Sequence, residues 1–372
     1  MQTIPDEAKQ VGIFFTRVRR TLALLSPDWV LFPSPTFRGE EKEKSDEIRP
    51  KAGRRRLKMH KIKQIPEDFF VREISSVKIE KEGNYSYFLL RKKNWNTIAA
   101  VGRIANLFGV PARLIGFAGN KDKIAVTEQV CSVLGVSRER IDGLKLDGIE
   151  LKFLDCGKKP VSLGDLEGNQ FEIVVRNIDE KPTTSKKNAK FVNYFGEQRF
   201  SEKNAEVGKA IVKRDFRKAA ELLIKDEPKM ANYLSEHAGD YVGALKRLPL
   251  RLLKLLVASY QSEIWNKLAG AVSRKAKKNV KLPIVGFGTE ETPDVRGILA
   301  KEELTTRDFV IREFPELSSE GGERELFAEA KDLEAGELEE DELNAGKKKI
   351  LLKFTLQKGS YATEFVRQLF GE

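Results

Sequence analysis

The first half of the chain alternates apolar and polar positions in short segments, the pattern of β-strands with one buried face. Segments with this signal lie at 71–80, 84–93, 112–119, 128–136, 149–157 and 171–179. One helix is predicted among them over 97–111, where Ile98, Val101, Ile104, Ala105 and Phe108 recur at helical spacing before Pro111. The pattern predicts an α+β fold with a mostly antiparallel sheet.

The spacing becomes helical between residues 201 and 318, with amphipathic runs at 204–225 and 245–275. Strand character returns over 350–361, and a helix is predicted over 362–372. We therefore expect a helix-rich domain, residues 201–318, inserted into a β-rich domain formed by residues 59–200 and 319–372. The acidic segment 329–346 is predicted to be a solvated loop or helix rather than a functional site.

Composition narrows the choice of partner. The chain has 67 Lys and Arg against 56 Asp and Glu, a net charge of +11, which favours an anionic partner, with nucleic acid ahead of a membrane surface. Two cysteines cannot form a disulfide framework, and His60 and His237 lack metal-ligand spacing, so we expect no metal site. Because we find neither a bilayer-spanning apolar run nor a cleavable signal, we expect a cytoplasmic protein.

Residues 1–58 differ from the rest of the chain. Their second half mixes charges of both signs with prolines and shows neither apolar period, so this segment is expected to be disordered. Two interpretations stay open. Either translation starts at Met59 and the segment is a misassigned extension, or the segment is a basic tail that helps to hold RNA.

The segment FAGNKDKIAVTEQV follows a predicted strand, and its small residues allow a tight turn before Asp122. Lys121 and Lys123 flank this aspartate, and positive charge favours its ionised form. An ionised aspartate can act as a nucleophile or as a base. Taken alone, however, the residues are more typical of a charged hairpin turn.

Two later segments also carry functional groups. VNYFGEQRF combines Asn193, Phe195 and Arg199, the groups needed to stack on an extruded base and to hold its edge or a phosphate. The alternative is a strand end with ordinary core aromatics. Near the C-terminus, Tyr361 lies among Ser and Thr residues that are typical N-caps of the helix predicted to follow.

Together, these segments resemble the TruD family of tRNA pseudouridine synthases. Six motifs of that family occur in family order over about 59–372: PEDFxVxE at 66–73, the Asn-Thr motif at 95–97, GxKDxxAxTxQ at 119–129, GNxFxIxxR at 168–176, NYFGxQRF at 193–200 and KGSYAT at 358–363. The family usually has Gly where Ser201 stands, a departure outside the catalytic segment.

The resemblance implies an archaeal-type isomerase that converts uridine to pseudouridine in tRNA, most often at position 13, after flipping the base out of the stack. It implies a pseudouridine synthase catalytic domain with an inserted TRUD domain, acting on tRNA without metal or organic cofactor. We expect a monomer, although the sequence does not determine the oligomeric state. Asp122 would be the essential carboxylate. Covalent attack, or removal of a ribose proton on the way to a glycal, both stay open.

The resemblance also implies which residues surround the uracil. Lys63 is the candidate for a cation beside Asp122, with Lys121 as the alternative. The further substrate-binding candidates are Phe69, Asn193, Phe195, Arg199 and Tyr361. A noncatalytic RNA-binding or tRNA-chaperone protein of the same fold is the alternative function, although the retention of Asp122 argues against it.

Overall fold

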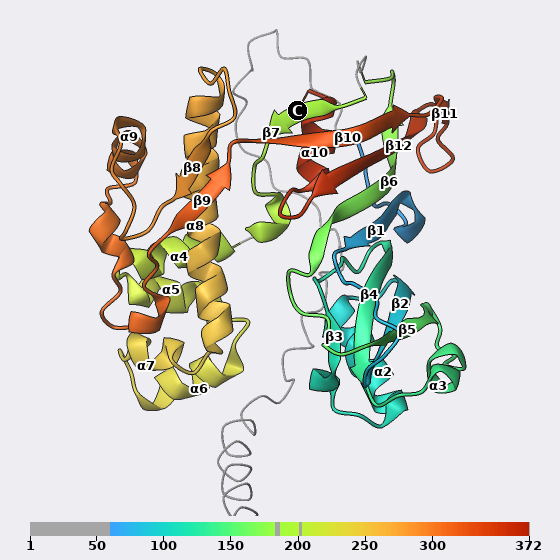
Figure 1. Cartoon of the computed structure of the whole chain (residues 1–372). Helices are drawn as coiled ribbons and strands as arrows, with labels where there is room; N and C mark the ends of the chain where they lie inside the picture. Colours follow the sequence, from blue (N-terminus) through green and yellow to red (C-terminus); the bar gives the residue numbers. More distant parts are fainter. Residues whose placement is uncertain (1–59, 183–186, 201–202, 372) are drawn as a thin grey trace, which may run out of the picture. The chain divides into compact units, whose positions relative to one another are not determined.

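The computed structural model describes residues 60–182, 187–200 and 203–371 (Figure 1). The expectations for residues 1–58 therefore lie outside the described residues, as does the departure at Ser201. No helix in the described ranges combines the length and the apolar character that a bilayer span requires.

Ten strands form one large sheet. They are β1 (Phe69–Ser75), β2 (Tyr85–Lys93), β3 (Ile115–Phe117), β4 (Val126–Leu134), β5 (Ile149–Gly157), β6 (Leu166–Ile178), β7 (Ala189–Val192), β10 (Phe327–Ala335), β11 (Glu339–Glu340) and β12 (Lys348–Gln357). The order is β5-β2-β4-β1-β6-β12-β10-β7, with β3 beside β4 and β11 beside β12. Among the described strands only β1 and β4 pair in parallel, which confirms the predicted mostly antiparallel α+β fold.

One face of this sheet carries a continuous apolar core. Val71 of β1 pairs with Phe171 of β6, which pairs with Phe354 of β12, so these side chains point to the same face. Helix α10 (Ala362–Leu369) covers the face, with the rings of Phe365 and Phe354 4.7 Å apart. Ala125, directly before β4, belongs to the same cluster, so the chain leading into β4 also lies on this face.

Helix α2 (Thr97–Phe108) packs against β2 and β4 through the predicted positions Val101, Ile104, Ala105 and Phe108. Ile98, predicted to lie on the same face, is exposed. The helix ends at Gly109, whose φ of 64° is the left-handed conformation that terminates helices, so Pro111 is not the stop. Helix α3 (Arg138–Asp142) is a short element before β5.

A second core holds the helical region: α4 (Asn204–Val212), α5 (Phe216–Leu223), α6 (Pro228–Glu236), α7 (Tyr241–Leu245), α8 (Leu250–Ser273) and α9 (Pro293–Lys301). The run predicted over 204–225 is two helices, because Arg214 adopts a φ of 60° and the Asp215 side chain caps α5. Strands β8 (Lys281–Ile284) and β9 (Gly322–Glu325) pair with each other beside α8 (Figure 1). Two residues after β9, the chain enters the large sheet again at Phe327, the first residue of β10.

The structure corrects part of the prediction for the acidic segment 329–346. Half of it, residues 329–335 and 339–340, belongs to β10 and β11 rather than to a loop or helix, and along β10 buried Ala328 and Ala330 alternate with Glu329. Alanines carry little hydrophobic signal, so the abundant glutamates hid a strand with one buried face. Further along, Asp341 is buried as well.

Asp341 belongs to a buried charge cluster around Arg176 of β6. The Arg176 guanidinium binds Asp68, which ends the 3-10 turn η1 (Pro66–Asp68), and it also binds Asp341 and Glu342 at 2.9 and 3.0 Å. These carboxylates raise the pKa of Arg176, with the hydrogen bond to Asp68 as the largest cause. The cluster ties the segment before β1 to the loop between β11 and β12.

Candidate active site

Asp122 lies in the loop between β3 and β4, with 38% of its side chain exposed. The Lys63 ammonium lies 2.5 Å from Asp122 Oδ2 and 4.1 Å from the centroid of the Phe69 ring. A neighbouring cation favours an ionised carboxylate, and an aromatic face favours a cation. Lys63 is therefore the lysine that faces the carboxylate, and its ammonium packs over the ring of Phe69.

Lys121, the alternative candidate, points elsewhere. Its ammonium lies 2.5 Å from Glu73 Oε2, and both side chains are almost fully buried. Glu73 Oε1 also accepts a 3.4 Å hydrogen bond from the Val130 N–H group. The two members of a buried ion pair are difficult to separate, because separation leaves an unpaired charge in the protein interior. Lys121 thus fastens the Asp122 loop to β1.

A third lysine, Lys92, also holds the loop that carries Asp122. Its side chain is 1% exposed, and its ammonium donates to the carbonyl oxygens of Trp95 at 2.6 Å, Asp122 at 2.8 Å and Lys121 at 3.4 Å. Burial lowers the pKa of Lys92 to about 8; attraction from Asp122 opposes this shift and repulsion from Lys121 adds to it. Lys92 was not among the residues predicted from the sequence.

Two further motif residues complete the support of the loop. The Thr97 hydroxyl accepts a hydrogen bond from the Lys121 N–H group at 2.8 Å and donates to Gln129 Oε1 at 3.2 Å. Gln129 Nε2 donates to the Gly119 carbonyl at 3.1 Å. Both side chains are buried. The loop is therefore held on several sides, while the Asp122 carboxylate stays partly exposed.

A second cluster forms around Phe195, which follows β7. Its ring is 8% exposed and packs edge-on against Trp265 of α8, with centroids 5.5 Å apart, and lies 6.3 Å from the ring of Tyr361. The side chain of Asn266 in α8 pairs with both the N–H and the carbonyl group of Phe195. The next residue in the chain, Gly196, has no room for a side chain, because an added Cβ atom would lie 2.8 Å from the Tyr361 ring.

Arg324 of β9 connects this cluster. It donates to the Asn193 carbonyl at 2.8 Å, to Asn193 Oδ1 at 2.7 Å and to the Gly359 carbonyl at 2.9 Å. Its Cζ atom lies 4.1 Å from the centroid of the Phe195 ring, and Arg199 Cζ lies 5.9 Å from the same ring. Asn193 is buried and its amide oxygen is used by Arg324. Sequence analysis selected Asn193, Phe195 and Arg199 but missed Arg324.

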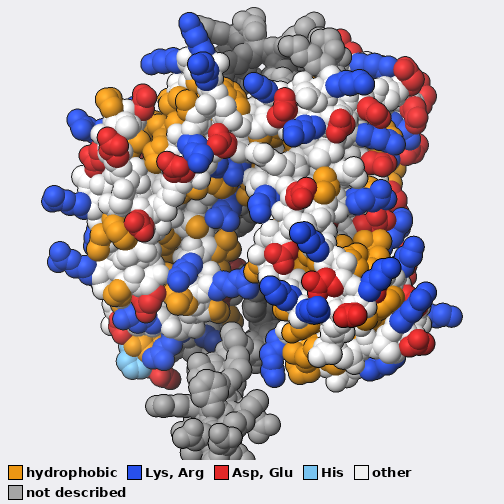
Figure 2. All heavy atoms as spheres, viewed as in Figure 1, with side chains coloured by type: hydrophobic (Ala, Val, Ile, Leu, Met, Phe, Trp, Pro, Cys, Tyr) orange, Lys and Arg blue, Asp and Glu red, His pale blue; other side chains and the backbone are white. Residues whose placement is uncertain are grey.

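The segments of both clusters are anchored to one face of the large sheet. Glu73, which holds the Asp122 loop, pairs across β1 and β6 with Asn169, and Asn169 pairs with Leu356 of β12. Tyr361 directly precedes α10, which packs on this face. In the view of Figure 2 the surface is hollowed between the helical region and strands β2 to β5, with Lys and Arg side chains along the hollow.

Comparison with known proteins identifies the family. The family model described as tRNA pseudouridine synthase D (TruD) matches residues 58–229, 224–286 and 270–369. The chain belongs to the TruD family. The TruD match spans both the large sheet and the helical region, and it includes every residue of the two clusters described above.

Individual TruD relatives agree. A curated protein from Methanosarcina acetivorans, named "Probable tRNA pseudouridine synthase D", is 30% identical over 83% of this chain and 92% of the relative. The tRNA pseudouridine synthase D of Aquifex aeolicus is 31% identical over 83% of this chain and 98% of its own. A crystal structure from Methanosarcina mazei, described as a candidate TruD protein, matches with a TM-score of 0.68 and 29% identity, covering 84% of this chain and 93% of the other.

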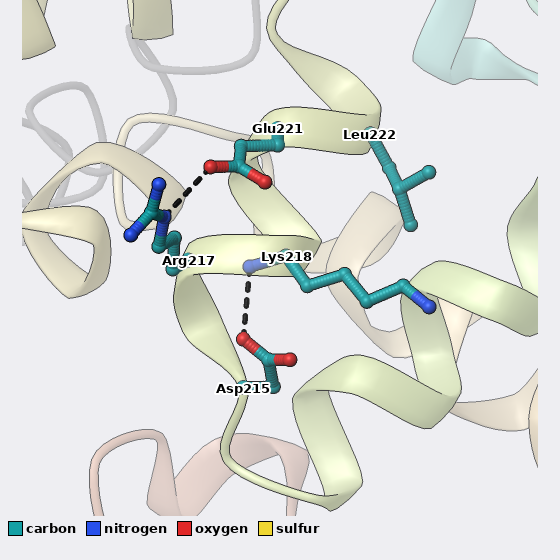
Figure 3. A pocket seen from close by; sticks show the side chains of 5 residues that line it. All are labelled: Asp215, Arg217, Lys218, Glu221 and Leu222. Carbon is teal, nitrogen blue, oxygen red and sulfur yellow. Dashed lines mark hydrogen bonds and ion pairs between the residues drawn. The ribbon is translucent and has the colours of Figure 1, made fainter.

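A pocket on α5 lies outside both clusters. Its lining residues are Asp215, Arg217, Lys218, Glu221 and Leu222 (Figure 3). Arg217 pairs with Glu221 at 2.8 Å, and the Asp215 carboxylate caps α5 by accepting from the Lys218 N–H group. The Lys218 ammonium pairs with Glu206 at 2.9 Å. Because these charges already have partners, we assign the pocket no role. The described ranges hold no group of His, Cys, Asp and Glu suited to a metal ion.

Proposed function

We propose that this TruD-family protein isomerises uridine to pseudouridine in tRNA, with Asp122 as the reacting carboxylate. The observation that carries the proposal is the contrast at Asp122. Its loop is fixed by buried groups, yet the carboxylate itself is 38% exposed beside the Lys63 ammonium. A rigidly held but accessible charged group is the arrangement that catalysis requires.

The reaction breaks the bond between N1 of uracil and C1′ of the ribose and forms a bond between C5 and C1′. The hydrogen on C5 is lost to solvent and N1 gains a proton, so substrate and product are isomers. Asp122 acts either by attacking the nucleotide or by removing a ribose proton, and both roles need the ionised carboxylate that Lys63 stabilises. The isomerisation involves no net redox change, and we propose that it needs neither metal nor organic cofactor.

The substrate must bring an unstacked uridine to this carboxylate. Unstacking costs a few kcal/mol and is cheapest at exposed positions of a structured RNA. We propose position 13 of tRNA as the target, since the family resemblance implies it. In this proposal residues 59–200 and 319–372 form the catalytic domain of a cytoplasmic monomer, and the inserted helices of 201–318 support Phe195 through Trp265.

Release of tritium from tRNA transcripts labelled at C5 of uridine tests this function. We expect release that depends on the protein, with the modified base mapped to position 13, and no release at that position from a transcript with cytidine there. A protein that binds the transcript without releasing tritium would instead favour the noncatalytic RNA-binding alternative. Release mapped to another position would change the target but keep the activity.

A further inference from the structure

Arg324 and Arg199 stand out because their charges are not neutralised. The Arg324 guanidinium is bound by two carbonyl groups and one amide oxygen, and Arg199 Nε donates only to the Ser262 hydroxyl at 3.3 Å. Among the described residues neither arginine forms an ion pair with a carboxylate. Arg176 and Arg217, by contrast, are both paired with carboxylates.

Arg324 is partly buried. A partly buried cation without a counter-charge is costly, since neutral acceptors replace its lost hydration only in part. Burial lowers the pKa of Arg324 to about 10, and repulsion from Arg199 adds to the effect, whereas Tyr361 acts in the opposite direction. Two guanidinium groups beside one aromatic ring therefore create a local positive potential that favours the binding of an anion. An incoming anion would meet groups whose desolvation has already taken place in the folded protein.

The Arg324 guanidinium also has donors left. It carries five N–H groups, of which three bind Asn193 and Gly359, so one N–H on each of Nη1 and Nη2 remains. The side chain is accessible in part, because Arg324 is of intermediate burial and Gly359, whose carbonyl it binds, is exposed. Its packing on Phe195 fixes the plane of the guanidinium, which suits recognition of two oxygens of one phosphate.

We propose that Arg324 and Arg199, held against the ring of Phe195, bind one backbone phosphate of the substrate RNA next to the uridine presented to Asp122. This inference rests on the proposed function. Asn193 and Phe195 then act through Arg324, as residues that position the guanidinium. One face of the Phe195 ring is already covered by Arg324, which agrees with support for the arginine rather than with stacking on the base.

RNA substrates with a single uncharged methylphosphonate test the inference. We expect one linkage near the target uridine at which neutralisation weakens binding to the wild-type protein about 10- to 100-fold. Arg324→Met should show a similar loss with the unmodified RNA and no further loss at that linkage. Its salt dependence of log K should be shallower by about 0.7 to 0.9, as expected for one lost phosphate contact.

Arg217→Gln is the matched control, because its charge is already paired with Glu221, and it should behave like the wild type. If Arg324→Met does not fold, Arg199→Gln provides the same cycle, since the one hydrogen bond of the Arg199 guanidinium within the described ranges goes to the Ser262 hydroxyl group. If, at every linkage, the methylphosphonate weakens binding of the variant by the same factor as binding of the wild type, the inference is wrong. An unchanged salt dependence of log K would also overturn it. Binding is measured without turnover, so a protein that shows the coupling but releases no tritium refutes the proposed function alone.

Discussion

Replacing Lys92 with methionine tests whether the buried attachments of the Asp122 loop control activity. Methionine fills a similar volume without a charge or a donor, so the core stays packed. The substitution removes the hydrogen bonds to the Trp95 and Asp122 carbonyl groups, at 2.6 and 2.8 Å, and the longer one to Lys121. The loop then keeps its attachments through Thr97 and through the pair of Lys121 with Glu73.

Two opposing terms set the effect of this change on stability. A pKa lowered from 10.5 to about 8 means that burying the Lys92 ammonium costs about 3 kcal/mol, which the substitution recovers. Each hydrogen bond of a charged group contributes about 1.5–3 kcal/mol, and two short ones are lost. We therefore expect a net loss of about 0–3 kcal/mol in the free energy of unfolding. Activity should suffer more, because a displacement of about 1 Å at a catalytic group costs about 100-fold in kcat.

The pH dependence of the wild type separates stability from activity. Since the pKa of Lys92 is lower in the folded protein than in the unfolded chain, the unfolded chain binds the proton more tightly between about pH 8 and 10.5. This residue therefore makes folding more favourable as the pH rises through that window, and its contribution is constant below about pH 8. A neutral amine has two N–H groups for three carbonyls, so kcat should fall above about pH 8 while the protein stays folded.

Single-turnover tritium release and urea unfolding, each followed across this pH range, provide the two measurements. Lys92→Met should reduce kcat about 100-fold and should lack the alkaline fall that Lys92 causes, whereas any fall due to the substrate remains. Lys93→Met is the control, because in the described part of the chain the Lys93 side chain pairs with Glu67 alone, at the surface, and its kcat should match that of the wild type. A Lys92→Met protein with wild-type kcat and an unchanged pH profile would refute the role given to Lys92.

Three further predictions concern other parts of the chain. Arg176→Met should lower the free energy of unfolding by about 3–5 kcal/mol in urea titrations, because it leaves Asp68 and Asp341 buried without a partner; a loss below about 1 kcal/mol would contradict this. Lys63→Met should reduce kcat about 100-fold or more and leave the Kd for tRNA within a few-fold, and an unaltered rate would remove the ion pair from the mechanism. Deleting residues 1–58 should leave a soluble and active protein, and an insoluble or inactive product would show that this segment is required.

The sequence predicted those features that depend on local spacing. Period-two alternation located most of the strands, helical spacing located α2, and the order of the motifs led to Asp122 and Lys63. Lys92 carried a usable signal, since it continues the alternation of buried Phe88 and Leu90 along β2. A lysine at a buried strand position indicates a specific partner, because an unpaired ammonium is not buried.

Other features depend on tertiary contacts that local spacing does not encode. Arg324 belongs to none of the recognised motifs, and it reaches Asn193 because β9 pairs with β8 in the helical region. The break between α4 and α5 depends on a left-handed Arg214, which the continuous apolar pattern did not indicate. The strand β10 was hidden because its buried positions are mostly alanine.

The most direct test of the account is the Asp122→Asn substitution, which keeps the size of the side chain and removes its charge. Pseudouridine formation should be followed in single turnovers with excess protein, and binding of the same tRNA should be measured in parallel. We expect conversion to fall by at least about 10⁴-fold while the Kd changes little. An Asp122→Asn protein that converts uridine at close to the wild-type rate would contradict it.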